Sequence, residues 1–237
     1  FLDVKNNQKK KWQFNDRRLQ TQSVLFNKCV LNDVKNNLWI GFWGLGLAKI
    51  NNVTQDFKLW QSTVKNSESG ISHNDVWAIY MDSKNRMWVG TNGGGLNLLV
   101  DEANSEFIKW LADENQPNSI SGNSIYCITE SKTGKHNTKS DQTILWIGTN
   151  KGLNKFVINN PANAFEKSRF NVEIIKYSIK DGLADNSVNG ILEDADGNLW
   201  LGTNSGITLF EVTKNKFTNF TKSDGIIGSN FNTTSAF

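Results

Sequence analysis

Several features that mark metal-binding, disulfide-rich or membrane-spanning proteins are scarce in this chain. It has two cysteines, Cys29 and Cys127, too few for a disulfide framework. Its two histidines, His73 and His136, have no second histidine or cysteine at ligand spacing, so we expect no zinc site, no other metal and no cofactor. No stretch approaches the ~18 consecutive apolar residues of a membrane helix. No signal peptide is visible, and the chain starts at Phe1, so we expect an excised or processed piece.

Charge of one sign is also missing. The 26 basic and 23 acidic residues are interspersed, which argues against a nucleic-acid or anionic-membrane surface. With only two prolines against 19 glycines, the turns must rely on Gly, Asn and Asp. Apolar residues make up only 38%, but nine Trp and 14 Phe supply enough apolar area for a core.

One pattern occurs four times and predicts the fold. It is centred on a Leu-Trp-Ile-Gly-like string, and an apolar strand precedes each copy. A glycine turn and two further short strands follow each copy, so each repeat of about 50 residues predicts four antiparallel strands, as in a propeller blade. We expect the first strands near 27–33, 75–82, 123–130 and 187–194. The anchor tryptophans of the four copies are Trp39, Trp88, Trp146 and Trp200.

These repeats predict an all-β propeller fragment with about four complete four-stranded blades and a partial blade at each end. A single blade cannot bury both of its faces, so neighbouring blades must pack on each other. Open sheet edges favour aggregation, so we expect missing sequence, a neighbouring propeller or a second copy to cover the ends. The expected segments are a partial blade over 1–22, blades over about 23–70, 71–118, 119–182 and 183–226, and the start of a next blade over 227–237.

The anchor tryptophans recur, which indicates core packing rather than ligand binding, because a binding site needs asymmetry. Trp43 and Trp77 do not recur, so each is a candidate for stacking on a ligand, with packing as the alternative. Loops rich in Asn, Ser and Asp lead into the inner strands and are candidates for a polar rim, although such residues also satisfy their own turns. The ligand candidates in these loops are His73, Asn74 and Asn123.

The fourth repeat, DGLADNSVNGILEDADGNLWLGTNSGITLF, resembles the two-component regulator propeller repeat nearly throughout. The second copy matches well, and the first and third copies match around the tryptophan. The resemblance implies the periplasmic sensor region of a hybrid two-component histidine kinase, possessing no catalytic residues of its own and responding in many relatives to an oligosaccharide. It also implies that membrane contact occurs only through other parts of the parent protein.

Two other functions stay open at this point. A lyase-like propeller enzyme would need an acid–base constellation at the channel mouth, and two non-recurrent histidines offer little for one. A scaffolding or dimerisation propeller would need no ligand. The cysteines fit any of the three functions: aligned on the repeat, Cys29 and Cys127 share one small-residue position of the inner strand, so we expect two buried, free thiols.

Overall fold

The computed structural model describes residues 26–62, 70–132, 142–159, 171–226 and 231, together with the backbone of 2–3 and 8–9. Within these residues the chain is built from β-strands, and the helices there are two short 3-10 turns, η2 (Val212–Lys214) and η3 (Lys222–Asp224). Neither they nor any other described segment forms a helix long and apolar enough to cross a membrane.

Sixteen of the strands form four antiparallel sheets, each of four consecutive strands. The first sheet contains β3 (Asn27–Asn32), β4 (Asn37–Phe42), β5 (Gly46–Asn51) and β6 (Phe57–Trp60). The second contains β7 (Val76–Met81), β8 (Met87–Thr91), β9 (Leu96–Asp101) and β10 (Glu106–Trp110). The third contains β11 (Ile125–Glu130), β12 (Thr143–Thr149), β13 (Gly152–Ile158) and β14 (Val172–Tyr177). The fourth contains β15 (Val188–Glu193), β16 (Leu199–Thr203), β17 (Gly206–Glu211) and β18 (Lys216–Phe220).

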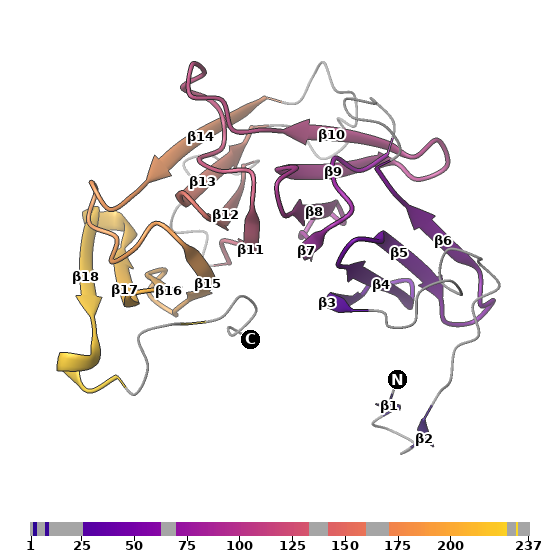
Figure 1. Ribbon diagram of the computed structural model, residues 1–237, viewed down its shortest axis with the longest axis horizontal. Helices are drawn as coiled ribbons and strands as arrows, with labels where there is room; N and C mark the ends of the chain where they lie inside the picture. The colour runs from indigo at the N-terminus through magenta and orange to yellow at the C-terminus, as the bar shows by residue number, and fades with distance from the viewer. Residues whose placement is uncertain are drawn as a thin grey trace.

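The four sheets fan out around a common centre (Figure 1). The first strand of each sheet, β3, β7, β11 or β15, lies toward that centre, and the fourth strand lies at the periphery. Consecutive inner strands are spatial neighbours. This arrangement confirms the four predicted blades and their inner strands. The partial blades expected at the two ends lie outside the described residues, apart from the paired strands β1 (Leu2–Asp3) and β2 (Gln8–Lys9) and from Phe231.

The core lies between the blades. In each of the first three blades, the anchor tryptophan is covered by apolar side chains of the following blade. Large aromatic side chains suit such an interface because each one removes a large area from water. The clusters contain Trp39 with Met87, Trp88 with Phe156, and Trp146 with Phe210.

Trp200 corrects the prediction that all four anchors are buried. Its side chain is 38% exposed, whereas that of Trp88 is 0% exposed. Among the described aromatic side chains, Trp200 stacks on Phe220 of its own blade, with 5.9 Å between ring centroids. The physical reason is that an anchor is buried by the next blade, and the described residues form no complete blade after the fourth.

An aspartate fixes each anchor ring in three of the four blades. The turn between the first and second strands places a carboxylate six residues before the tryptophan, where it accepts a hydrogen bond from the indole Nε1. In the second blade Asp82 also accepts bonds from Arg86 Nε and from two backbone N–H groups. The three bonds are Trp39 to Asp33 at 2.9 Å, Trp88 to Asp82 at 2.8 Å and Trp200 to Asp194 at 3.3 Å.

Close packing requires the glycine two residues after the anchor in the first three blades, and the fourth blade also has a glycine at this position. The glycine pairs with the third position of the inner strand, which holds Cys29, Ala78, Cys127 or Gly190. A Cβ atom on Gly41 would lie 2.4 Å from the Sγ of Cys29, and one on Gly148 would lie 2.5 Å from the Sγ of Cys127. The two cysteines therefore share one structural position, as predicted, and both are free thiols. Desolvation by burial raises the pKa of each thiol to about 12.

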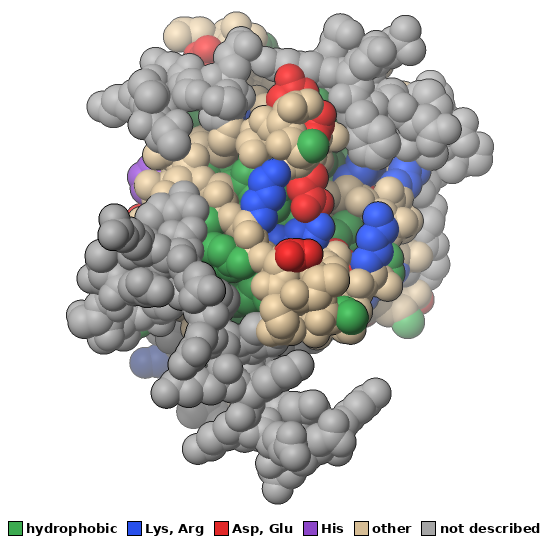
Figure 2. Space-filling model, turned by 90° about the vertical axis from the view of Figure 1, so that its right-hand side faces the viewer, with side chains coloured by type: hydrophobic (Ala, Val, Ile, Leu, Met, Phe, Trp, Pro, Cys, Tyr) green, Lys and Arg blue, Asp and Glu red, His purple; other side chains and the backbone are tan. Residues whose placement is uncertain are grey.

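The outer surface mixes charges of both signs. On the side of the molecule seen in Figure 2, basic and acidic side chains lie close together. Across the first two blades, Lys49 Nζ lies 2.8 Å from Glu102 Oε1. The visible described residues therefore form no patch of a single sign on this side.

Candidate functional site

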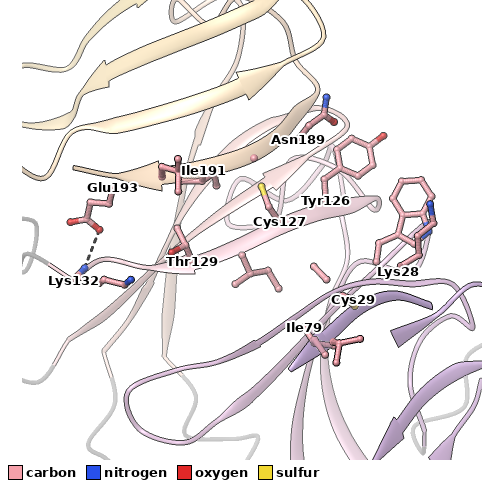
Figure 3. Close-up of a pocket in the computed structure, with 16 residues that line it drawn as sticks. Lys28, Cys29, Ile79, Tyr126, Cys127, Thr129, Lys132, Asn189, Ile191 and Glu193 are labelled. Carbon is pink, nitrogen blue, oxygen red and sulfur yellow. Dashed lines mark hydrogen bonds between the residues drawn. The ribbon is translucent and has the colours of Figure 1, made fainter. Parts of the chain in front are cut away.

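The four inner strands line an open cavity of about 510 Å³ at the centre of the fan (Figure 3). In a repeat protein this is where side chains from every blade converge. Each of the inner strands, β3, β7, β11 and β15, contributes consecutive lining residues. Residues from all four blades therefore line one cavity.

A β-bulge occurs at the same position in every inner strand. The pairing with the second strand skips the second residue of β3, β7, β11 and β15. A bulged residue drops out of the ladder, and its side chain is aimed differently from those of its neighbours. The skipped residues are Lys28, Trp77, Tyr126 and Asn189, and all four line the cavity.

We call these four residues the channel ring. Lys28, Tyr126 and Asn189 lie at one end of the cavity in Figure 3. Trp77 stacks on Tyr126 with 5.4 Å between ring centroids, and Lys28 Nζ lies over the Trp77 ring at 5.1 Å. Asn189 Nδ2 donates to Asn204 Oδ1 and to the backbone carbonyl of Phe231. The anchor position is tryptophan in every blade, whereas the bulged position has a different residue in each blade.

Two features of the ring concern its capacity for hydrogen bonding. The Nε1 of Trp77 is buried and has no hydrogen-bond partner in the described structure, an arrangement that costs about 1–3 kcal/mol. Burial raises the pKa of Tyr126, which keeps its phenol neutral and able to donate a hydrogen bond. Half-buried aromatic faces and a neutral hydroxyl are the groups expected in a small-molecule site.

Trp43 extends the ring toward solvent. It lies in the turn after β4, is 55% exposed, and has Lys28 Nζ 5.0 Å from its ring centroid. Its backbone N–H donates to the carbonyl of Phe26, whose side chain is also exposed. Lys28 therefore contacts two indoles, Trp43 and Trp77, both of which were candidates from the sequence.

His73 holds the loop beside Trp43. Its Nδ1 accepts a hydrogen bond from the backbone N–H of Asp75 at 3.0 Å. Asp75 Oδ1 in turn accepts from the backbone N–H of Gly44 at 2.6 Å, which ties the turn carrying Trp43 to the second blade. His73 is thus placed to position the turn, and it does not line the cavity.

Asn74 and Asn123 make the same contact in successive blades. Their side-chain oxygens accept backbone N–H bonds from Ser62 and Ala112, each at 2.7 Å, and so clamp the end of one blade to the loop that enters the next. Asn186 does the same in the fourth blade. Recurrence indicates a structural role, and the ligand role of Asn74 and Asn123 stays a prediction.

Sequence reasoning identified Trp77 and missed the rest of the ring. Lys28, Tyr126 and Asn189 lie in the strings KCVL, IYCI and VNGI, where each reads as an ordinary strand residue. The available signal was the column that precedes the small residue of each inner strand. That column varies from Lys to Trp, Tyr and Asn, whereas neighbouring columns repeat.

The far end of the cavity is occupied by structural contacts. Glu193 accepts hydrogen bonds from the Ser131 hydroxyl at 3.2 Å and from the backbone N–H of Lys132 at 3.0 Å (Figure 3). These bonds join the third and fourth blades. No cluster of three or more His, Cys, Asp or Glu residues among the described side chains could hold a metal ion.

Comparison with known proteins agrees with the repeat. The model of the two-component regulator propeller family matches residues 70–93 and 182–205, which contain the second and fourth anchors. These two segments are similar to the propeller repeat of that family. Histidine kinase P4 of Formosa agariphila is 28% identical over 203 residues, which cover 84% of this chain and 13% of the kinase.

Two solved structures of extracellular domains from two-component systems are similar in fold to this chain. The extracellular domain of the hybrid two-component system BT3049 of B. thetaiotaomicron superposes with a TM-score of 0.64 at 24% identity. That of BT4673 gives 0.61 at 25% identity. The matches cover 88% and 82% of this chain, and 25% of each extracellular domain. The chain is therefore similar in fold to these two extracellular domains, and it spans about a quarter of their length.

Proposed function

We propose that this chain is a periplasmic, non-enzymatic sensing module of a hybrid two-component histidine kinase, and that its channel ring binds an oligosaccharide. One observation carries the proposal. A structure that otherwise repeats itself places Lys28, Trp77, Tyr126 and Asn189 at one equivalent, bulged position facing one cavity. The similarity to extracellular domains of two-component systems supports the signalling context.

The ring suits a sugar because its faces are aromatic and its edges are polar. Saccharides present apolar C–H faces that lie on aromatic rings, and hydroxyls that bond to nearby donors and acceptors. A ligand seated there would contact inner strands of several blades at once. Its binding would therefore hold these blades in one relative arrangement, which is a physical route from occupancy to a signal.

The chemistry of the cavity favours binding over catalysis. Its described carboxylate, Glu193, is engaged by Ser131 and Lys132 at the end opposite the ring. An acid–base mechanism needs titratable groups that converge on one reacting atom. The ring itself supplies a lysine, two aromatic side chains and an amide, which fits recognition better than lyase chemistry.

We also propose that another blade of the parent protein, or a second copy of this chain, covers the exposed face of the fourth blade. Three anchors equivalent to Trp200 are covered in this way by the following blade. Light scattering of the isolated chain tests this partner: dimers or larger assemblies are expected, and a stable monomer at high concentration would contradict it.

Thermal unfolding in the presence of defined neutral and acidic oligosaccharides tests the binding function. A ligand that binds only the folded state raises Tm by mass action. The variants Trp77→Leu and Tyr126→Leu should lose the shift, whereas the matched control Trp200→Leu, outside the cavity, should keep it. If both ring variants keep the full shift, the site lies elsewhere; if no saccharide shifts the wild-type chain, the purely scaffolding alternative is favoured.

A further inference from the structure

The charge of Lys28 is the feature of the ring that packing does not explain. Its Nζ lies 5.0 Å from the Trp43 centroid and 5.1 Å from the Trp77 centroid. No ion pair or hydrogen bond from this Nζ to any other described residue accompanies these contacts. An ammonium on indole faces gains about 0.5–2 kcal/mol from the ring quadrupoles and keeps its N–H donors for another partner.

Exposed aromatic side chains lie near Lys28, where a ring-shaped ligand could pack on them. Trp43 is exposed at the end of the channel ring, and Phe26, its backbone partner, is 63% exposed. Large apolar side chains that stay in water at one place indicate a surface that is covered when a partner is bound. Tyr126, which stacks on Trp77, adds a hydroxyl at the same cavity.

We infer that the channel ring binds a negatively charged saccharide, carrying a uronate or sulfate group, with the anionic group on Lys28 and the sugar ring on Trp43. This inference rests on the function proposed above and narrows its ligand class. The anionic group completes the donor set of Lys28 through charge-assisted hydrogen bonds, which are stronger than neutral ones. The aromatic faces contact the apolar side of the sugar, and Tyr126 bonds to a hydroxyl.

Calorimetric titration of the full chain with matched oligosaccharides tests the inference. The probes are a galacturonate tetrasaccharide and its carboxyl-reduced form, and a sulfated galactose tetrasaccharide and its desulfated form. At least one acidic member should bind about 10-fold or more tighter than its neutral counterpart, as expected for a bond to a charged group. Added salt should weaken only the acidic member.

Three variants test whether Lys28 causes the difference in affinity between acidic and neutral oligosaccharides. Lys28→Met keeps the apolar stem and should remove the preference for the acidic member, whereas Lys28→Arg should retain it. The control Lys214→Met, at an exposed lysine of η2 on the outer edge, should behave as wild type. Circular dichroism confirms that each variant is folded before its affinity is compared.

Each outcome separates the two proposals. If neutral members bind as tightly as acidic ones, and Lys28→Met changes nothing while Trp77→Leu abolishes binding, the charged-ligand inference is wrong and the sensing function stands. If acidic members bind but Lys28→Met leaves their affinity intact, the anionic group lies elsewhere and the inference is again wrong. If no probe binds the folded wild-type chain, both proposals are overturned.

Discussion

Replacing Trp88 and Trp200 with alanine provides a matched comparison of a covered and an uncovered anchor. Both residues occupy the same position of the second strand, and both donate Nε1 to the aspartate six residues earlier. They differ in what lies on the ring. Trp88 is 0% exposed and packs edge-on against Phe156 of the next blade at 5.5 Å, whereas Trp200 is 38% exposed.

The magnitudes follow from burial. Trp88→Ala removes the side chain from a closed interface and leaves a cavity, so the free energy of unfolding should fall by about 3–5 kcal/mol. Trp200→Ala removes a side chain that already faces solvent on one side, and no closed cavity results. The loss should then be limited to the transfer free energy of the buried part, about 1–2 kcal/mol.

Urea denaturation followed by circular dichroism measures both losses. The m-value should be unchanged in each variant, because the same surface is exposed on unfolding. The reasoning is refuted if the two variants lose the same free energy, or if Trp200→Ala loses more. Either result would mean that the fourth anchor is as well covered in solution as the second.

Further predictions concern the turns, the glycines and the thiols. Asp82→Ala should lower the free energy of unfolding by about 3–5 kcal/mol in urea denaturation, because it removes the buried carboxylate that accepts hydrogen bonds from Trp88 and Arg86. Asp194 is more exposed, so Asp194→Ala should lower it by about 1 kcal/mol or less. Equal losses in the two variants would contradict the role of the buried hydrogen bonds. Gly90→Ala should cost about 1–3 kcal/mol by the same measurement, because the new Cβ would lie 2.6 Å from Ile125 Cγ2 of the next inner strand; unchanged stability would mean that the blades are packed less closely. Cys29 and Cys127 are half-buried rather than fully buried and line the cavity, but the raised pKa of each thiol should make both react slowly with a thiol reagent in the native protein and faster after unfolding in urea. Two fast-reacting native thiols would contradict this prediction. Because the folded pKa of about 12 lies above the unfolded value of 9.0, their contribution to stability is complete below pH 9 and is lost as the pH rises toward 12; denaturation midpoints in this range should fall less in the Cys29→Ala, Cys127→Ala double variant.

The fold could be predicted from local sequence because each blade forms from consecutive residues. The pairing of a strand with the next one depends on alternation, turn residues and the small residue opposite the glycine, and all of these lie within about 50 residues. The inner strand predicted near 123–130 is observed as β11 (Ile125–Glu130), and the one near 187–194 as β15 (Val188–Glu193). The aspartate that holds the anchor indole was read only as a turn residue, because its bond to Nε1 appears only when the hairpin closes.

Two features could not be predicted from local sequence: the burial of a side chain between blades and the direction of a bulged side chain. The exposure of Trp200 depends on the absence of a complete following blade from the described residues, and its own repeat, the best match to the family pattern, contains no sign of it. Lys28 precedes the apolar residues of its strand, and in the sequence it looks like an ordinary strand residue. Only the bulge, a feature of the pairing of β3 with β4, brings it over the Trp77 ring.

The central claim is that this protein binds its ligand at the channel ring. The indole N–H signals of its nine tryptophans test this claim most directly. These signals are recorded by ¹H–¹⁵N NMR during titration with the galacturonate and sulfated galactose tetrasaccharides, and single Trp→Phe variants assign them. At saturation with a ligand that binds, the Trp43 and Trp77 signals should shift, while those of Trp88 and Trp146 stay in place. Binding that leaves Trp43 and Trp77 unchanged, or that shifts only Trp200, would contradict the claim.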